Sequence, residues 1–92
     1  MPRPKKQRLL KHKPNTYYFK PRSIPLRNLQ EVNLLPDELE ALKLHDVDGF
    51  DHKESANKMN VSQPTFGRII DKAYKKIADA VVNGKAIRIE KN

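Results

Sequence analysis

The 92-residue chain has no cysteine, no tryptophan and only three glycines. Without cysteine, a disulfide framework, a thiolate zinc site and a thiol nucleophile are all excluded. No apolar run is longer than three residues, so we expect no segment that crosses a membrane. No hydrophobic core of a signal peptide follows Met1. We therefore expect one cytoplasmic domain without a membrane partner.

The sequence also lacks the residue groups that carry catalysis. His12, His45 and His52 lie in different segments without a second ligand at metal-binding spacing, so we interpret each as a surface side chain. Residues 46–51 weakly resemble a calcium loop, but the glycine comes too early and no glutamate closes it. No nucleophile–base pair stands out. We expect no catalytic residue, no metal site and no cofactor, and therefore a protein that is not an enzyme.

What the chain has in excess is positive charge. Nineteen lysines and arginines against eleven aspartates and glutamates give a formal net charge of +8. Residues 1–22 carry eight basic and no acidic side chains, residues 23–51 two basic and seven acidic, and residues 52–92 nine basic and four acidic. Such a surplus in a small domain indicates a polyanionic partner, most commonly nucleic acid. Because phosphates repel the acidic middle, we expect the two ends to make the contacts.

Composition divides the chain into three parts. Residues 1–14 form a basic, flexible arm, because their few apolar side chains cannot offset the entropy lost on ordering. Residues 15–34 form an extended segment that packs on the domain, with a short strand at the aromatic run 17–19. Stacking on single-stranded bases is the alternative role of that run. Residues 35–92 form a helical domain that ends in a strand.

The first helix is expected to begin at Pro36, which suits the first helical position. Leucine and valine side chains at helical spacing predict its buried stripe: Leu35, Leu39, Leu42 and Val47. Gly49 supplies the left-handed residue that ends the helix. Asp51, three residues before Glu54, then caps the next helix.

The segment from residue 52 onward has the pattern of a helix-turn-helix. A short helix is followed by Asn60, which tolerates positive φ, by Val61 as an apolar plug and by Ser62 as the next N-cap. Apolar side chains then recur at helical spacing to about residue 82: Phe66, Ile69, Ile70, Ala73, Ile77 and Val81. This order favours a helix-turn-helix. A plain helical hairpin without a role in DNA binding is the alternative.

Several motifs together resemble one family of short prokaryotic proteins. They are MPRPKK at the start, Tyr18–Pro21, Ile24–Leu26, Asp37–Ala41, Val61–Ser62 with Thr65–Phe66, and Val82–Ala86. They are similar to uncharacterised protein family 0251, also called domain of unknown function 134, over nearly the whole chain. The resemblance implies a DNA-binding protein with a helix-turn-helix similar to the fourth region of bacterial sigma factors. Two residues depart from the family: Gln7 replaces a frequent cysteine, and Gln63 replaces a frequent arginine.

The expected fold is mainly α. It is a three-helix helix-turn-helix domain, like the fourth region of sigma factors, with the basic arm and a small β element. The β element is predicted because residues 85–90 alternate between charged and apolar side chains, with Ile87 and Ile89 facing inward. This C-terminal strand is expected to pair with Glu31–Leu34 or with the aromatic run.

In a helix-turn-helix the start of the second helix enters the major groove. The side chains predicted to read base edges there are Gln63, Pro64, Gly67, Arg68 and Lys72. Gln63 suits adenine and Arg68 suits guanine. Phosphate contacts are predicted for Lys58, Ser62, Thr65 and Lys75, and in the arm for Arg3, Lys5, Lys6 and Arg8.

Two alternatives stay open for this helix. Gly67, which costs a helix about 1 kcal/mol relative to alanine, serves either a close approach to DNA or tight helix packing. Lys72, Lys75 and Lys76 are either DNA contacts or an ordinary solvated face.

We expect a sequence-specific transcriptional regulator that reads duplex DNA with the helix that starts near Gln63. One alternative is a nonspecific binder of DNA or RNA that acts through the basic arm. The other is an interaction module whose partner is RNA polymerase or another transcription protein. The sequence leaves a homodimer open.

Overall fold

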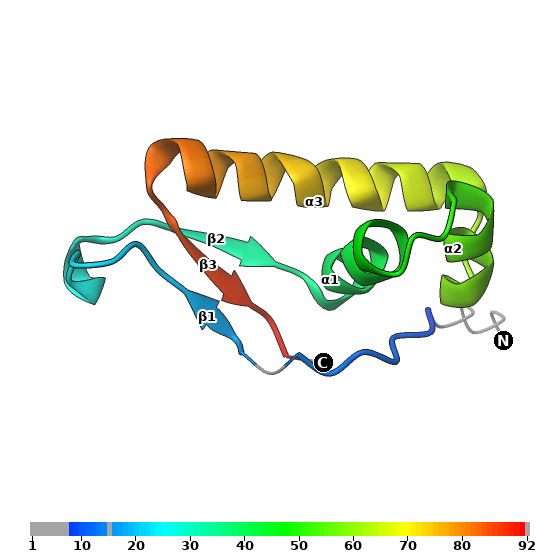
Figure 1. Cartoon of the computed structure of the whole chain (residues 1–92), viewed down its shortest axis with the longest axis horizontal. Coiled ribbons are helices and arrows are strands. Elements are labelled where there is room, and N and C mark those ends of the chain that lie inside the picture. Colours follow the sequence, from blue (N-terminus) through cyan, green and yellow to red (C-terminus); the bar gives the residue numbers. More distant parts are fainter. Residues whose placement is uncertain (1–7, 15, 92) are drawn as a thin grey trace, which may run out of the picture.

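The computed structural model describes residues 8–14 and 16–91. Its helices are α1 (Pro36–Leu42), the π-helical turn η2 (Lys43–Val47), α2 (His52–Met59) and α3 (Gln63–Asn83). Its strands are β1 (Tyr18–Phe19), β2 (Glu31–Leu34) and β3 (Ala86–Ile89), and the 3-10 helix η1 (Leu26–Asn28) precedes β2. α3 runs along the molecule, with α1 and α2 packed beneath one half and the sheet beneath the other (Figure 1). The mainly α fold with three helices and a small β element is confirmed.

β3 is the central strand of the sheet, whose order is β1-β3-β2. It pairs antiparallel with β1, where Tyr18 lies opposite Arg88, and parallel with β2, where Glu31 lies opposite Ala86. The sequence predicted pairing with one of these two segments, and β3 pairs with both. The parallel pairing needs a long crossover connection. The helices α1 to α3 provide it, so the helical part is inserted between two neighbouring strands.

The first helix changes its geometry before it ends. α1 continues into η2, whose wider π-helical turn rotates the side chains that follow. Leu44 is therefore buried, whereas Val47 is 78 % exposed. The prediction that Val47 continues the apolar stripe was wrong, because a period of 3.6 residues does not hold through a π-helical turn. Gly49, at φ +82°, lies beyond this turn in the left-handed conformation, as predicted.

The turn between α2 and α3 has the predicted caps. The Asp51 carboxylate accepts the Glu54 N–H at 2.8 Å at the start of α2. Asn60 ends that helix at φ +60°. The Ser62 hydroxyl accepts the Thr65 N–H at 3.2 Å and caps α3. These local contacts set the phase of α3, and hence the side chains that it exposes.

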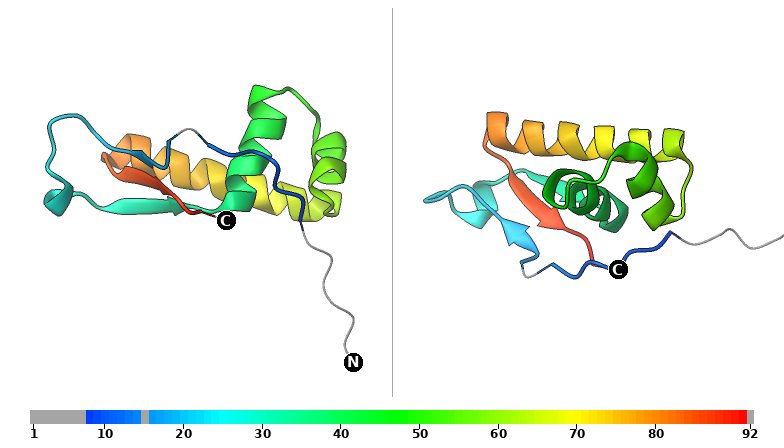
Figure 2. Two further views of the ribbon diagram at one scale, coloured as in Figure 1. Left: turned by 90° about the horizontal axis from the view of Figure 1, so that it is seen from below. Right: turned by 45° about the vertical axis from the view of Figure 1, so that its right-hand side comes forward.

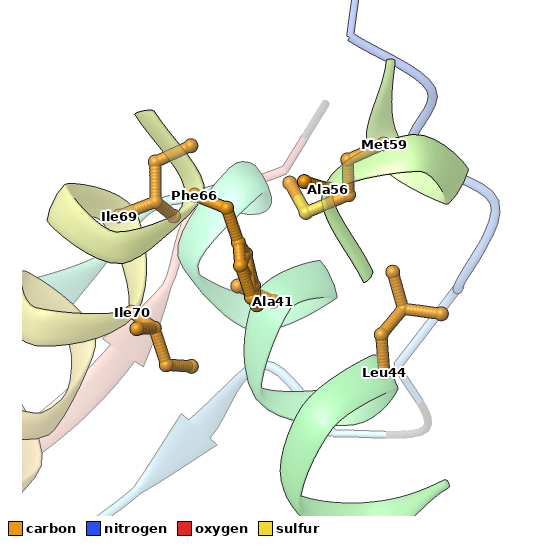
Figure 3. Close-up of a cluster of buried hydrophobic side chains, with 7 residues drawn as sticks. All are labelled: Ala41, Leu44, Ala56, Met59, Phe66, Ile69 and Ile70. Atoms are coloured by element: carbon orange, nitrogen blue, oxygen red, sulfur yellow. The ribbon is translucent and has the colours of Figure 1, made fainter. Parts of the chain in front are cut away.

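The core of the helical half collects side chains from all three helices (Figure 3): Ala41, Leu44, Ala56, Met59, Phe66, Ile69 and Ile70. The Phe66 ring packs edge-on against His52, with the centroids 5.2 Å apart, and against His45 at 6.2 Å. His45 Nδ1 lies 2.7 Å from the carbonyl oxygen of Phe50, which also accepts the Ser55 hydroxyl at 3.3 Å. The interpretation of His45 and His52 as plain surface side chains was wrong. Both are half-buried and pack where the helices meet.

A second cluster joins α3 to the sheet: Leu34, Ala73 and Ile89. Near the end of α3, Ala80 is buried, and Val81 is 74 % exposed. The prediction of a buried Val81 was wrong, because four full turns after Phe66 end closer to residue 80 than to residue 81. α3 is thus amphipathic along its length. Within the described part of the chain, none of the helices combines the length and the apolar character that a membrane span requires.

Candidate nucleic-acid interface

The first turns of α3 present one exposed face. Phe66, Ile69 and Ile70 are buried against α1 and α2 and fix the rotation of the helix. The residues that the sequence assigned to base edges lie on the other side: Gln63, Pro64, Arg68 and Lys72 are exposed, and Gly67 is partly exposed. The structure therefore brings all five predicted base-reading residues to one surface.

Among the described residues, Gly67 has no neighbour that requires a glycine. A Cβ atom placed there meets no atom within 4 Å. Tight helix packing, one of the two explanations for this residue, is contradicted. A close approach by an external partner is the explanation that stays a prediction.

Three polar side chains at the start of α3 are linked by hydrogen bonds. The Ser62 hydroxyl donates to Thr65 Oγ1 at 2.8 Å, and Arg68 Nη2 donates to the same oxygen at 3.3 Å. These bonds hold the guanidinium of Arg68 against the first turn of α3. Two predicted phosphate contacts and one predicted base contact thus form a single network.

The other predicted phosphate contacts of the helical part are spread out. Lys58 Nζ lies 4.5 Å above the Phe50 ring centroid, within cation–π distance. Lys75 pairs with Asp71, four residues earlier on α3, at 3.1 Å, and its side chain is 77 % exposed. Lys75 therefore fits the interpretation of a solvated helix face.

Lys76 differs from its neighbour because it faces α1. Its Nζ donates to Glu38 Oε1 at 2.7 Å, and the Glu38 side chain is only 2 % exposed. The same oxygen accepts the Leu35 N–H at 2.8 Å, which closes a cap at the start of α1. Removing one partner of such a buried pair leaves an uncompensated charge. Lys76 is therefore a structural tie between α1 and α3.

Residues 8–13, which the sequence analysis placed in a flexible arm, run along the underside of the helices (Figure 2). The Leu9 N–H donates to the Met59 carbonyl at 3.0 Å, and the His12 N–H donates to the Glu40 carboxylate at 2.9 Å. Leu10 packs against the helical core. In this part of the arm, two backbone N–H groups and the Leu10 side chain thus contact the helical half.

Among the arm cations that the sequence assigned to phosphates, Arg8 lies within the described residues. Its guanidinium forms an ion pair with Asp37 near the start of α1. Arg3, Lys5 and Lys6 lie outside the described residues. Because Leu9 is bonded to the last residue of α2, Arg8 lies close to the turn that precedes α3.

Tyr74 makes a contact that the sequence did not predict. Its hydroxyl donates to the Asp46 carboxylate, with O···O distances of 2.8 and 2.7 Å. Partial burial, followed by this hydrogen bond, raises the pKa of Tyr74 to about 12. The bond ties η2 to the middle of α3. Helical periodicity cannot reveal it, since the acceptor comes from the π-helical turn.

The described residues contain no group of three or more histidines and carboxylates that could hold a metal ion.

Comparison with known proteins finds one family. A family model described as "Protein of unknown function DUF134" matches residues 1–92. A UPF0251 protein of Desulfosudis oleivorans is 57 % identical over 98 % of this chain, which spans 65 % of that protein. A UPF0251 protein of Caldanaerobacter subterraneus is also 57 % identical over 98 % of this chain and 76 % of its own length. No solved structure matches the chain.

Proposed function

The chain belongs to the DUF134 family, and we propose that it is a cytoplasmic DNA-binding protein that regulates transcription. In this proposal the first turns of α3 enter the major groove of duplex DNA, and Gln63 reads a base edge there. The backbone of α3 approaches the groove at Gly67, where no side chain intervenes.

The observation that carries the proposal is the exposed face of α3 directly after the short turn that follows α2. Residues 62–70 contain no acidic side chain, and the exposed members of this run are Ser62, Gln63, Pro64 and Arg68. A carboxylate at this place would repel phosphates. The absence of one, the open surface at Gly67 and the chain's net charge of +8 fit an approach by a polyanion.

The position of Arg8 supports the proposal that the start of α3 is the surface that contacts DNA. Arg3, Lys5 and Lys6 precede Arg8 by five residues or fewer in the sequence. Arg8 lies beside the α2–α3 turn, and we propose that the arm contacts the duplex from there. The basic arm and the predicted base-reading face are thus available to the same duplex.

A competition assay tests the proposal. Preferred sites are selected from a random pool of duplex DNA, and the labelled selected duplex is then challenged with random duplex and with RNA at fixed, physiological salt. We expect random duplex and RNA to displace it only at about a thousandfold higher concentration. Equal competition by all three would indicate a nonspecific nucleic-acid binder. If the chain binds no nucleic acid and instead a stable protein partner, the interaction-module alternative holds.

Gln63 provides the matched variant for specificity. Gln63→Ala is expected to lower the preference for the selected site by about 1–3 kcal/mol, the discrimination that a paired amide gives at a base edge. Gln30→Ala, at an exposed glutamine in the loop before β2, is the control and is expected to leave the preference unchanged. An equal ratio of selected to random affinity in both variants would contradict the role of Gln63.

A further inference from the structure

A hollow of about 280 Å³ lies between the start of α1 and the first turns of α3. Three cationic side chains contribute to its lining: Arg8, Arg68 and Lys72. Thr65 places its hydroxyl among them, and Leu35 and Ile69 add apolar wall. Positive groups that lie far apart in the sequence thus converge on one small space.

The carboxylates of this hollow already have partners. Asp37 forms its ion pair with Arg8, and Glu38 is buried against Lys76. Arg68 and Lys72, in contrast, form no ion pair with any described residue. The two unpaired cations therefore leave the hollow with a surplus of positive charge.

The spacing of the two unpaired cations makes this arrangement unfavourable without an anion. Arg68 and Lys72 are four residues apart on α3, and like charges at this spacing destabilise a helix. The Thr65 hydroxyl accepts hydrogen bonds from Ser62 and from Arg68, so its own proton is available for another acceptor. An anionic oxygen in the hollow would meet both cations and that proton.

We propose that this hollow binds one phosphodiester group of the DNA backbone through Arg8, Thr65, Arg68 and Lys72. The inference rests on the proposed function and changes one part of it. Arg68 and Lys72 hold the backbone and fix the register of α3, and base reading belongs to Gln63 and its neighbours. The guanidinium groups suit a phosphate because they donate in a planar fork, and Lys72 adds a point charge.

Inorganic phosphate is the first probe. The full chain is titrated with phosphate at constant ionic strength, and the Thr65 amide and the Arg68 Nε–H signals are followed by NMR. We expect both signals to shift and saturate together, and Lys72→Met to weaken the binding about fivefold. Lys91→Met is the matched control, because Lys91 lies over the Tyr17 ring, away from the hollow, and is expected to bind phosphate like the parent.

Duplex DNA is the second probe. Each neutralised phosphate contributes about 0.9 to the slope of log affinity against log salt. Because three cations share one phosphate, the triple variant Arg8→Met, Arg68→Met, Lys72→Met is expected to lower the slope by about 1, whereas three separate contacts would lower it by about 3. The single variant Arg68→Met is expected to weaken selected and random duplex by the same factor, and Lys91→Met to leave the slope unchanged.

The outcomes separate this inference from the proposed function. Duplex binding with an unchanged slope in the triple variant, or a loss of three units, overturns the shared phosphate site alone. A changed preference between selected and random duplex in Arg68→Met returns Arg68 to base reading and overturns it as well. Saturable binding of inorganic phosphate without any binding of duplex overturns the proposed function together with the assignment to the DNA backbone.

Discussion

Phe66 lies where the three helices of the domain meet. Its side chain is fully buried, and it contacts one histidine from η2 and one from α2. The rotation of α3, and with it the exposure of Gln63, depends on this ring. A single aromatic side chain thus links the stability of the fold to the presentation of the candidate interface.

We expect Phe66→Ala to destabilise the domain by about 3–5 kcal/mol, because it leaves a cavity between the helices. A loss of this size is a large fraction of the stability of a small domain. Chemical denaturation followed by circular dichroism measures it. Val81→Ala is the control, since Val81 is 74 % exposed and its truncation is expected to cost little. Equal unfolding midpoints for the two variants would contradict the packing described above.

Gly67→Ala is expected to change stability and binding in opposite directions. Alanine favours a helix over glycine by about 1 kcal/mol, and the added methyl group has open space around it among the described residues. The melting temperature is therefore expected to rise. The affinity for duplex DNA is expected to fall, because the methyl group occupies the space between the helix and the groove. A variant that is stabilised and binds with the parent's affinity would show that the backbone makes no close approach at this position.

At the scale of the elements, α1 and α3 are tied together by polar contacts that join distant segments. Lys76 pairs with Glu38 in α1, and Tyr74 donates to Asp46 in η2. These ties hold the π-helical turn and the start of α1 against α3. They complete a frame around the helix whose first turns form the candidate interface.

The Tyr74–Asp46 bond predicts a pH dependence at the alkaline end. The pKa of Tyr74 is raised to about 12, so the folded state favours the neutral phenol. Stability from the partly buried neutral phenol and its hydrogen bond to Asp46 is therefore complete below the usual tyrosine pKa of about 10, and it is lost as the pH rises toward 12. Denaturation of the parent and of Tyr74→Phe across this range measures the effect. Two profiles with the same slope between pH 10 and 12 would show that the bond does not stabilise the fold.

Because residues 8–13 contact the helices, we expect deletion of residues 1–7 and deletion of residues 1–13 to differ in their effect on stability. Removing residues 1–7 keeps Leu9, Leu10 and His12, so we expect the melting temperature to equal that of the parent. The slope of log affinity against log salt for duplex binding is expected to fall by about 2–3, because Arg3, Lys5 and Lys6 are lost. Removing residues 1–13 also removes the His12 N–H that donates to the buried Glu40, and the Leu10 side chain that packs against the core. We expect this longer deletion to lower the melting temperature markedly. Equal melting temperatures for the two deletions would contradict the docking of this segment.

Local chemistry explains how much of this fold the sequence predicts. Asp51, Asn60 and Ser62 act within their own turns, and each caps a helix at the predicted place. The period of α3 likewise predicts Phe66 and Ile70 as buried. These features depend on neighbours in the sequence, which a pattern can display.

Features that depend on contacts between distant segments escaped the sequence. The π-helical turn shifts Leu44 inward and Val47 outward, and nothing in the local pattern marks it. The docking of residues 8–13 requires Glu40, which periodicity cannot link to His12. The hollow formed with Arg8, Arg68 and Lys72 has the same origin, since Arg8 is far from α3 in the sequence and lies beside it only in the fold.

At the scale of the whole molecule, the helical part is inserted between the parallel strands β2 and β3. The sheet therefore closes one end of the molecule, and the α2–α3 turn lies at the other (Figure 1). The exposed start of α3 and the entry of residues 8–13 share that second end. This polarity separates a structural end from a candidate binding end.

Amide chemical-shift mapping with a selected duplex tests the proposed contact between α3 and DNA, because it locates the contact surface on the folded chain. We expect the largest changes at residues 62–68 and at Arg8 and Lys72, with the amides of β1, β3 and the last turn of α3 unchanged. Saturable changes centred on the sheet, or no change on addition of duplex at physiological salt, would contradict it.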